Sequence, residues 1–117
     1  MRILIGLALG AVAFGAPVAA GAQERTAYTQ IVSGDFRAAE QQLAAERRIF
    51  PQRPELMLNL AAVYGRTSRD RDAAALYNAV LAQPNVEMDV GGDRTAWSHD
   101  LAQAGIRRLA GMQLSLR

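Results

Sequence analysis

The run Ser98-His99-Asp100 contains the three residue types of an acyl-transfer triad. In such a triad the hydroxyl attacks a carbonyl, the imidazole takes the hydroxyl proton and the carboxylate orients the imidazole. The surrounding pattern predicts a helix, and consecutive residues of a helix project about 100° apart. Three adjacent side chains therefore cannot form this relay, and the sequence predicts no catalytic triad here.

Acidic residues gather just before and around this run: Glu87, Asp89, Asp93 and Asp100 lie close to His99 in the sequence. Carboxylates at suitable spacing bind calcium, but these positions do not follow the calcium-loop pattern, and no bidentate glutamate follows at the required place. The stretch is interpreted as a solvated acidic loop. We predict no metal and no other cofactor.

The densest basic cluster comprises Arg66, Arg69 and Arg71, and it is interrupted by Asp70 and Asp72. Local ion pairs and helix capping are the predicted uses of this cluster. The 117-residue chain has no cysteine and a net charge of only +2. Disulfides, a thiolate nucleophile and zinc ribbons are excluded, and nothing in the charge favours nucleic acid. The sequence therefore predicts neither an enzyme nor a nucleic-acid-binding protein.

The first 22 residues have the pattern of a cleavable signal peptide. Met1-Arg2 gives a positive start, an uncharged apolar run follows, and Ala20-Gly21-Ala22 supplies small residues before a polar segment. This pattern predicts cleavage after Ala22 and a periplasmic or secreted protein. A retained membrane anchor is the alternative, since the uncharged run approaches the roughly 20 residues that a span needs.

Helical periodicity and turn residues divide the rest of the chain. Gly34 and Asp35 predict a helix end and an N-cap, and Pro51 and Pro54 predict the next break. Gly91-Gly92 within a polar stretch predicts an irregular loop. The predicted helices cover residues 25–32, 36–50, 54–66, 69–83 and 94–110, and the predicted loop covers residues 86–93.

Two pairs of residues recur at a spacing of 34. Ala39 recurs as Ala73, and the bulky Leu43 recurs as Tyr77. This is the length of a helix-turn-helix unit of a solenoid, in which small residues let helices approach and large residues fill the space between them. All four side chains are expected to be buried.

The two central segments resemble the tetratricopeptide repeat family. In the first unit the resemblance rests on Gly34-Asp35-Phe36-Arg37-Ala38-Ala39, Leu43 and Pro51, and in the second on Leu60-Ala61-Ala62-Val63-Tyr64, Asp72-Ala73, Tyr77, Val80-Leu81 and Pro84. The second unit has Ser68-Arg69-Asp70 where the family has Gly-Asp-aromatic, and no third unit follows Pro84.

The resemblance implies an all-α superhelix of two antiparallel helix hairpins, residues 23–85, followed by a loop at 86–93 and a capping helix and tail at 94–117. The capping helix is expected to bury Trp97, Leu101, Ala104, Leu109 and Met112. A solenoid needs such a cap because each unit leaves one apolar face open. If Trp97 is buried, Trp97→Ala costs about 3 to 5 kcal/mol.

The resemblance also implies that a ligand binds the concave face formed by the first helix of each unit. The matching positions are Glu55, Leu58, Asn59, Ala62 and Arg66. Asn59 can hydrogen-bond a peptide backbone and Arg66 can pair with a carboxylate. The alternative interpretation of this strip is an ordinary solvated helix face.

These observations predict a non-catalytic protein-interaction module of the cell envelope that binds a peptide or protein of unspecified identity. Two alternatives remain open at this point. One is a structural protein that self-associates into a homo-oligomer through Ala-rich repeat edges. The other is an adaptor that stays tethered to the membrane by its first 22 residues.

Overall fold

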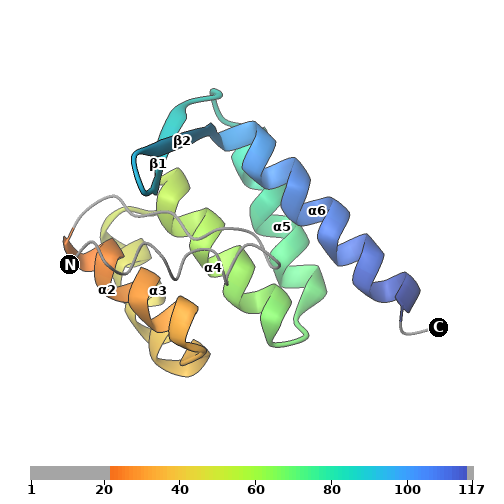
Figure 1. Ribbon diagram of the computed structural model, residues 1–117, viewed down its shortest axis with the longest axis horizontal. Coiled ribbons are helices and arrows are strands. Elements are labelled where there is room, and N and C mark those ends of the chain that lie inside the picture. The colour runs from red at the N-terminus through yellow and green to blue at the C-terminus, as the bar shows by residue number, and fades with distance from the viewer. Residues whose placement is uncertain (1–21, 116–117) are drawn as a thin grey trace.

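The computed structural model describes residues 22–115, and it describes side chains from residue 27 to residue 112. The described residues form five helices and one β-hairpin (Figure 1). The helices are α2 (Ala22–Ser33), α3 (Phe36–Ile49), α4 (Pro54–Arg66), α5 (Asp70–Leu81) and α6 (Ser98–Ser115), and the strands are β1 (Glu87–Gly91) and β2 (Arg94–Trp97). The predicted signal peptide lies outside the described residues except for Ala22.

The first two turns use the residues that the sequence singled out. Gly34 has a φ of +87°, which ends α2, and the Asp35 side chain accepts a hydrogen bond from the Ala38 amide to cap α3. Pro54 occupies the first turn of α4, where no N–H is required, and Glu55 follows it near the positive end of the helix dipole. These predicted helix boundaries are confirmed.

The turn between α4 and α5 differs from the prediction. Neither Ser68 nor Asp70 caps α5, because the N-cap position is Arg69 and its side chain makes no capping hydrogen bond. Ser68 instead adopts a φ of +64° in the turn. The helix is also shorter than predicted, since it begins at Asp70 and ends at Leu81.

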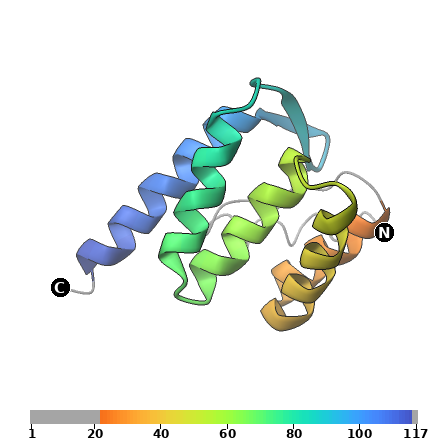
Figure 2. The same ribbon diagram turned by 180° about the vertical axis from the view of Figure 1, so that it is seen from behind.

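Helix α4 is the centre of the molecule. It contacts α3 and α5, its neighbours in the chain, and also α2 and α6, which lie two helices away (Figures 1 and 2). Every residue from Leu56 to Val63 is buried as a result. The four residues of the repeated pattern, Ala39, Leu43, Ala73 and Tyr77, are also buried, which confirms that expectation.

The predicted loop at residues 86–93 is wrong, because most of it folds as β1. This strand pairs antiparallel with β2, and the two-residue connection Gly92-Asp93 has positive φ at both positions. Such a connection matches the twist of paired strands. Met88 and Val90 point inward and are buried, so the hairpin covers one end of the helical core. The protein is therefore mostly helical with a small two-stranded sheet.

The predicted start of the last helix is wrong for the same reason, since residues 94–97 belong to β2. Helix α6 begins at Ser98 and extends to Ser115, beyond the predicted end. Its side towards the core carries Ser98, Ala102, Gly105 and Leu109, which are buried at helical spacing. The predicted burial of Trp97 is also wrong: its side chain lies on the outer side of the hairpin and is 46% exposed. The large cost predicted for Trp97→Ala therefore no longer applies.

Candidate functional site

The five residues predicted to bind a ligand do not form an open strip. Leu58, Asn59 and Ala62 are buried, while Glu55 and Arg66 are half-buried. The cause is the central place of α4, whose surface is covered on several sides by neighbouring helices. Neither the expected ligand-binding strip nor its solvated alternative describes this helix, because Asn59 is fully buried.

Two of these five residues nevertheless line a surface hollow. Ala62 and Arg66 contribute to it from α4, beside Gly65, and Tyr77 contributes from α5. The opposite wall comes from α6 and consists of Gly105, Arg108, Leu109 and Met112. The hollow therefore combines an apolar lining with one arginine on each of two helices.

A close approach of α5 and α6 shapes the floor of this hollow. A Cβ atom added to Gly105 would lie 2.2 Å from Cζ of Tyr77, which shows that the aromatic ring rests directly against the helix backbone. Burial raises the pKa of the Tyr77 hydroxyl to about 12, although the positive charge of Arg108 acts in the opposite direction. Tyr77 is therefore neutral at physiological pH and serves as an apolar wall.

Arg66 is held in place by an aromatic ring. Its guanidinium group lies 4.5 Å from the centroid of the Phe36 ring at the start of α3, a geometry that stabilises a cation. Burial lowers the pKa of Arg66 from its usual value. That value is so high that the side chain remains charged at neutral pH. The hollow is therefore bordered by fixed positive charge.

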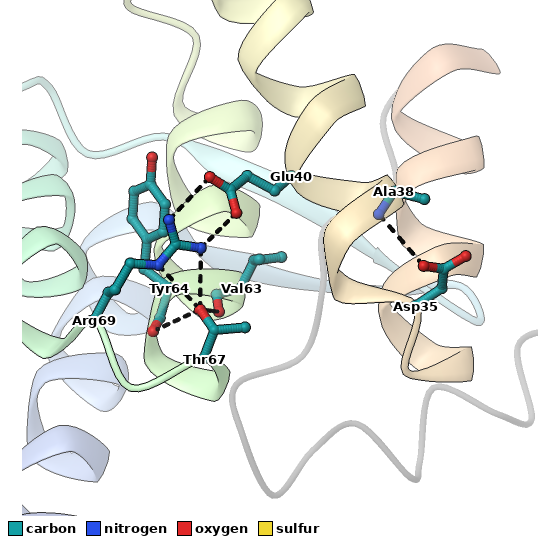
Figure 3. Close-up of polar contacts among 7 residues, drawn as sticks. All are labelled: Asp35, Ala38, Glu40, Val63, Tyr64, Thr67 and Arg69. Atoms are coloured by element: carbon teal, nitrogen blue, oxygen red, sulfur yellow. Dashed lines mark hydrogen bonds and ion pairs between the residues drawn. The ribbon is translucent and has the colours of Figure 1, made fainter.

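An ion pair fixes α3 against the turn that follows α4. Arg69 donates from Nη1 to Oε2 of Glu40 at 3.0 Å and from Nη2 to the other carboxylate oxygen, so the pair is bidentate (Figure 3). The Arg69 side chain also donates to Thr67 and lies over the ring of Tyr64. Arg69 lowers the pKa of Glu40, chiefly through its hydrogen bond to the carboxylate.

This ion pair refines the prediction for the basic cluster. The partner of Arg69 is not a local residue of the turn but Glu40, which is 29 residues away in the sequence. Because Phe36 and Glu40 both belong to α3, this helix contacts Arg66 and Arg69 together. Helix α3 therefore holds in place the end of α4 that carries Arg66 on one side of the hollow.

The Ser98-His99-Asp100 run serves the junction between the hairpin and α6. Ser98 is buried, and its hydroxyl accepts a hydrogen bond from the Val86 amide at 3.0 Å and donates to Asn85. The His99 ring nitrogen Nε2 lies 2.7 Å from the carbonyl oxygen of Gln83. These contacts give Ser98 and His99 a structural role at this junction.

The acidic residues near the hairpin form no metal centre within the part of the chain that the structure describes, where no group of three possible ligands lies close enough together. Glu87 and Asp89 point outward from β1 and are exposed. Their side chains accept hydrogen bonds from Thr95 and from the Gly91 amide. They belong to the surface of the hairpin rather than to an irregular loop.

Sequence reasoning missed the α6 residues of the hollow as site residues. Leu109 and Met112 were expected to be buried residues of the capping helix. A signal was present, because Ala102, Gly105, Leu109 and Met112 follow one another at helical spacing with a glycine in the middle. Because Trp97 was included in the predicted apolar face, that face was assigned to a neighbouring side of the helix.

The described chain is thus a mostly helical protein with a β-hairpin across one end and a shallow basic hollow between α4, α5 and α6. No protein-family model, curated protein or solved structure gives a significant match to this chain. Between residues 22 and 115, no helix has both the length and the apolar character needed to cross a membrane.

Proposed function

We propose that this chain is a non-catalytic protein-interaction module that binds a segment of a peptide or protein in the hollow between α4 and α6. The observation that carries the proposal is the lining of that hollow, in which Arg66 and Arg108 stand beside the apolar side chains of Ala62, Leu109 and Met112. Such a lining offers charge recognition and apolar contact at the same place.

We further propose that the helices form a short stack of the tetratricopeptide repeat type. The support is the order of contacts, in which α4 touches α2 on one side and α6 on the other, and each helix also touches its neighbour in the chain. Equivalent positions of the two hairpins are buried alike: Ala39 and Ala73 are buried small residues, and Leu43 and Tyr77 are buried large ones.

The size and charge of the hollow narrow the ligand. Its cavity volume is only about 10 Å³, because the hollow is open to solvent. Pockets for drug-sized molecules measure roughly 300 to 1,000 Å³, so this hollow suits a surface contact with part of a larger partner. Because Arg66 and Arg108 both border it, the expected ligand segment carries a carboxylate next to an apolar side chain. Binding through so small a contact is expected to be weak.

A pair of matched variants tests this proposal. Arg66→Ala removes a charge that lines the hollow. Arg107→Ala removes an exposed charge of α6 that lies next to Arg108 in the sequence but does not line the hollow. Acidic-apolar peptides and captured envelope proteins are expected to bind Arg66→Ala about 10-fold more weakly or worse, since a charge-assisted hydrogen bond contributes roughly 1.5 to 3 kcal/mol. Binding to Arg107→Ala is expected to match the parent. Equal binding by Arg66→Ala and the parent would refute the site.

We also propose that the module acts after export, in the periplasm or outside the cell. The support is the N-terminal pattern, namely Arg2, an uncharged apolar run and small residues up to Ala22. The mass of the exported protein tests this, because cleavage after Ala22 predicts a chain that begins at Gln23. An exported chain that keeps residues 1–22 would favour the membrane-tethered alternative.

A further inference from the structure

Large apolar side chains are exposed at one end of the molecule. Within the described part of the chain, Ile49, Phe50, Val86 and Trp97 are 68%, 39%, 38% and 46% exposed, respectively. The first two lie where α3 ends and the other two lie in and beside the hairpin. Figures 1 and 2 place the end of α3, the start of α4 and the hairpin at the same end of the helical array.

A direct contact supports this placement. Gln83, which follows α5, donates from Nε2 to the backbone carbonyl and the side-chain oxygen of Gln52, both at 3.0 Å. Gln52 lies in the turn between α3 and α4, and Gln83 lies just before the hairpin. The two exposed apolar segments therefore belong to one continuous end, which we call the hairpin end and define by residues 47–53 and 86–97.

One half of the hairpin end is basic. Arg53 lies over the ring of Phe50 with its guanidinium carbon 3.9 Å from the ring centroid, so the aromatic ring and the cation are held together. Arg47 donates to the carbonyl of Pro51 at 3.1 Å, and Arg48 beside it is exposed. This half combines an exposed aromatic ring with three guanidinium groups.

The other half carries three carboxylates, Glu87, Asp89 and Asp93, against the single cation of Arg94, so it is acidic on balance, and it also carries an aromatic ring. Trp97 pairs with Glu87 across the hairpin, and Thr95 donates to Glu87 at 2.8 Å, which orients the carboxylate. Asp89 lies on the same outward side of β1. A tryptophan beside carboxylates is complementary in charge and chemistry to a partner surface that offers a guanidinium group beside a ring.

We propose that the hairpin end is the surface through which two copies of this chain associate. Its two halves have opposite charge and similar apolar content, and they lie side by side at the same end. A two-fold rotation then sets the basic half of each copy against the acidic half of the other, so both contacts form at once. Trp97, Phe50 and Arg53 are of the types that dominate binding energy at protein interfaces.

A second copy fits this end better than a foreign basic peptide does. Such a peptide would pair with Glu87 and Asp89 but would leave Ile49 and Phe50 exposed, whereas a second copy covers both halves. The inference does not rest on the proposed peptide binding, because the hollow lies at the other end of α4 and shares no lining residue with the hairpin end.

The first test measures association of the parent protein purified after export. Sedimentation velocity over a wide range of concentrations is expected to show a monomer that becomes a dimer. The chain has a single tryptophan, Trp97, so its fluorescence emission reports directly on the proposed contact. We expect the emission to shift to the blue as the dimer forms. A protein that remains a monomer at all concentrations up to about 1 mM would have a Kd too weak for a specific dimer, and this result would overturn the proposal.

Charge reversal provides the decisive test. Arg53→Glu and Glu87→Arg are each expected to weaken dimerisation at least 10-fold, because each places like charges together twice in a two-fold dimer. Mixing the two variants restores both opposite-charge contacts, so we expect a mixed dimer with a Kd within about threefold of the parent. The matched control is Arg37→Glu, an exposed reversal at the other end of α3, which leaves association unchanged.

Each alternative outcome has a distinct signature. Dimerisation of Arg53→Glu and Glu87→Arg with the parent's Kd places the interface elsewhere and overturns the proposal. A parent that stays monomeric while an arginine-rich peptide shifts the Trp97 emission assigns the acidic half to a foreign partner instead. Glu87 is exposed and Arg53 is half-buried over Phe50, so circular dichroism is expected to match the parent and thermal unfolding to change by no more than the loss of that cation–π contact.

Discussion

The contact between Gly105 and Tyr77 offers the sharpest test of how α5 and α6 are arranged. A methyl group at position 105 would lie 2.2 Å from Cζ and 2.5 and 2.6 Å from the two Cε atoms of the Tyr77 ring. Carbon atoms in contact are normally about 3.5 to 4.0 Å apart, so the ring would have to move by more than about 1 Å. The ring is almost fully buried, and the helices must separate to allow this movement.

Two effects of Gly105→Ala oppose each other. Alanine favours the helix over glycine by about 1 kcal/mol. Forcing an extra carbon into a well-packed contact costs about 1 to 3 kcal/mol and occasionally more. Because this contact is so short and the ring is rigid, we expect its cost at the upper end of that range or above it. We expect a net loss of about 2 kcal/mol in the free energy of unfolding, which lowers Tm by roughly 10 °C in a domain of this size.

The same helix supplies the control. A Cβ atom at Gly111 meets nothing within 4 Å, so Gly111→Ala is expected to gain up to about 1 kcal/mol from helix propensity alone. Urea unfolding should therefore give opposite signs for two identical substitutions in α6. In a Tyr77→Leu background, Gly105→Ala should lose most of its cost, because the ring it meets is gone. If Gly105→Ala is as stable as the parent, the reasoning about this helix contact is refuted.

Three further predictions concern stability. Glu40→Gln is expected to cost about 0.5 to 1 kcal/mol at pH 7, because the ion pair with Arg69 is partly exposed. The pKa of Glu40 is lowered on folding, so the difference in the free energy of urea unfolding between the variant and the parent should shrink as pH falls below about 4. Burial raises the pKa of Tyr77 to about 12, so its contribution to the free energy of unfolding is complete below the unfolded pKa of about 10 and is lost as pH rises towards 12. An absorbance titration should show one tyrosine that ionises at higher pH than usual, together with a loss of stability at alkaline pH. Normal titration of every tyrosine would contradict the burial of Tyr77. Ser98→Ala leaves the Val86 amide without its hydroxyl acceptor and should cost about 1 to 3 kcal/mol in urea unfolding, whereas a change within error would exclude this role.

The sequence predicted the helical part of the fold well, for reasons that lie in single residues. Gly34 and Asp35 leave little freedom at the first turn, and Pro54 fixes the start of α4. The 34-residue recurrence of Ala39 as Ala73 placed both alanines in the interior. These features are local, or repeat locally, and so can be recognised without knowledge of the tertiary contacts.

The hairpin was missed although its pattern is visible in retrospect. Residues 87–90 alternate polar and apolar side chains, and Gly91-Gly92-Asp93 supplies positive φ for a tight connection. The short length and the two glycines favoured a loop. A single short hairpin is marginal without support, so its stability depends on the burial of Met88 and Val90 against the helices, which the sequence alone does not reveal.

The binding strip on α4 was only partly predictable because a periodic pattern does not tell how many neighbours a helix has. Leu58 and Asn59 lie on the side predicted to bind a ligand, but α4 lies between four other helices, and that side is covered as well. Arg66 is only half-buried because it lies in the last turn of α4, where it borders the hollow. The half-exposed end of the central helix is thus the part available for binding.

The two proposed surfaces lie at opposite ends of α4, and this separation has a functional consequence. Pro54 begins the helix at the hairpin end and Arg66 ends it at the hollow, so 13 residues at about 1.5 Å each place them roughly 20 Å apart. Association through the hairpin end would therefore leave the hollow of each copy accessible. Two weak sites on one dimer can bind a partner with two matching segments far more tightly than either site alone, provided that the spacing of the segments fits. A dimer of this kind offsets the small area of each hollow, and Arg53→Glu should weaken binding of a two-segment partner without affecting binding of a single segment.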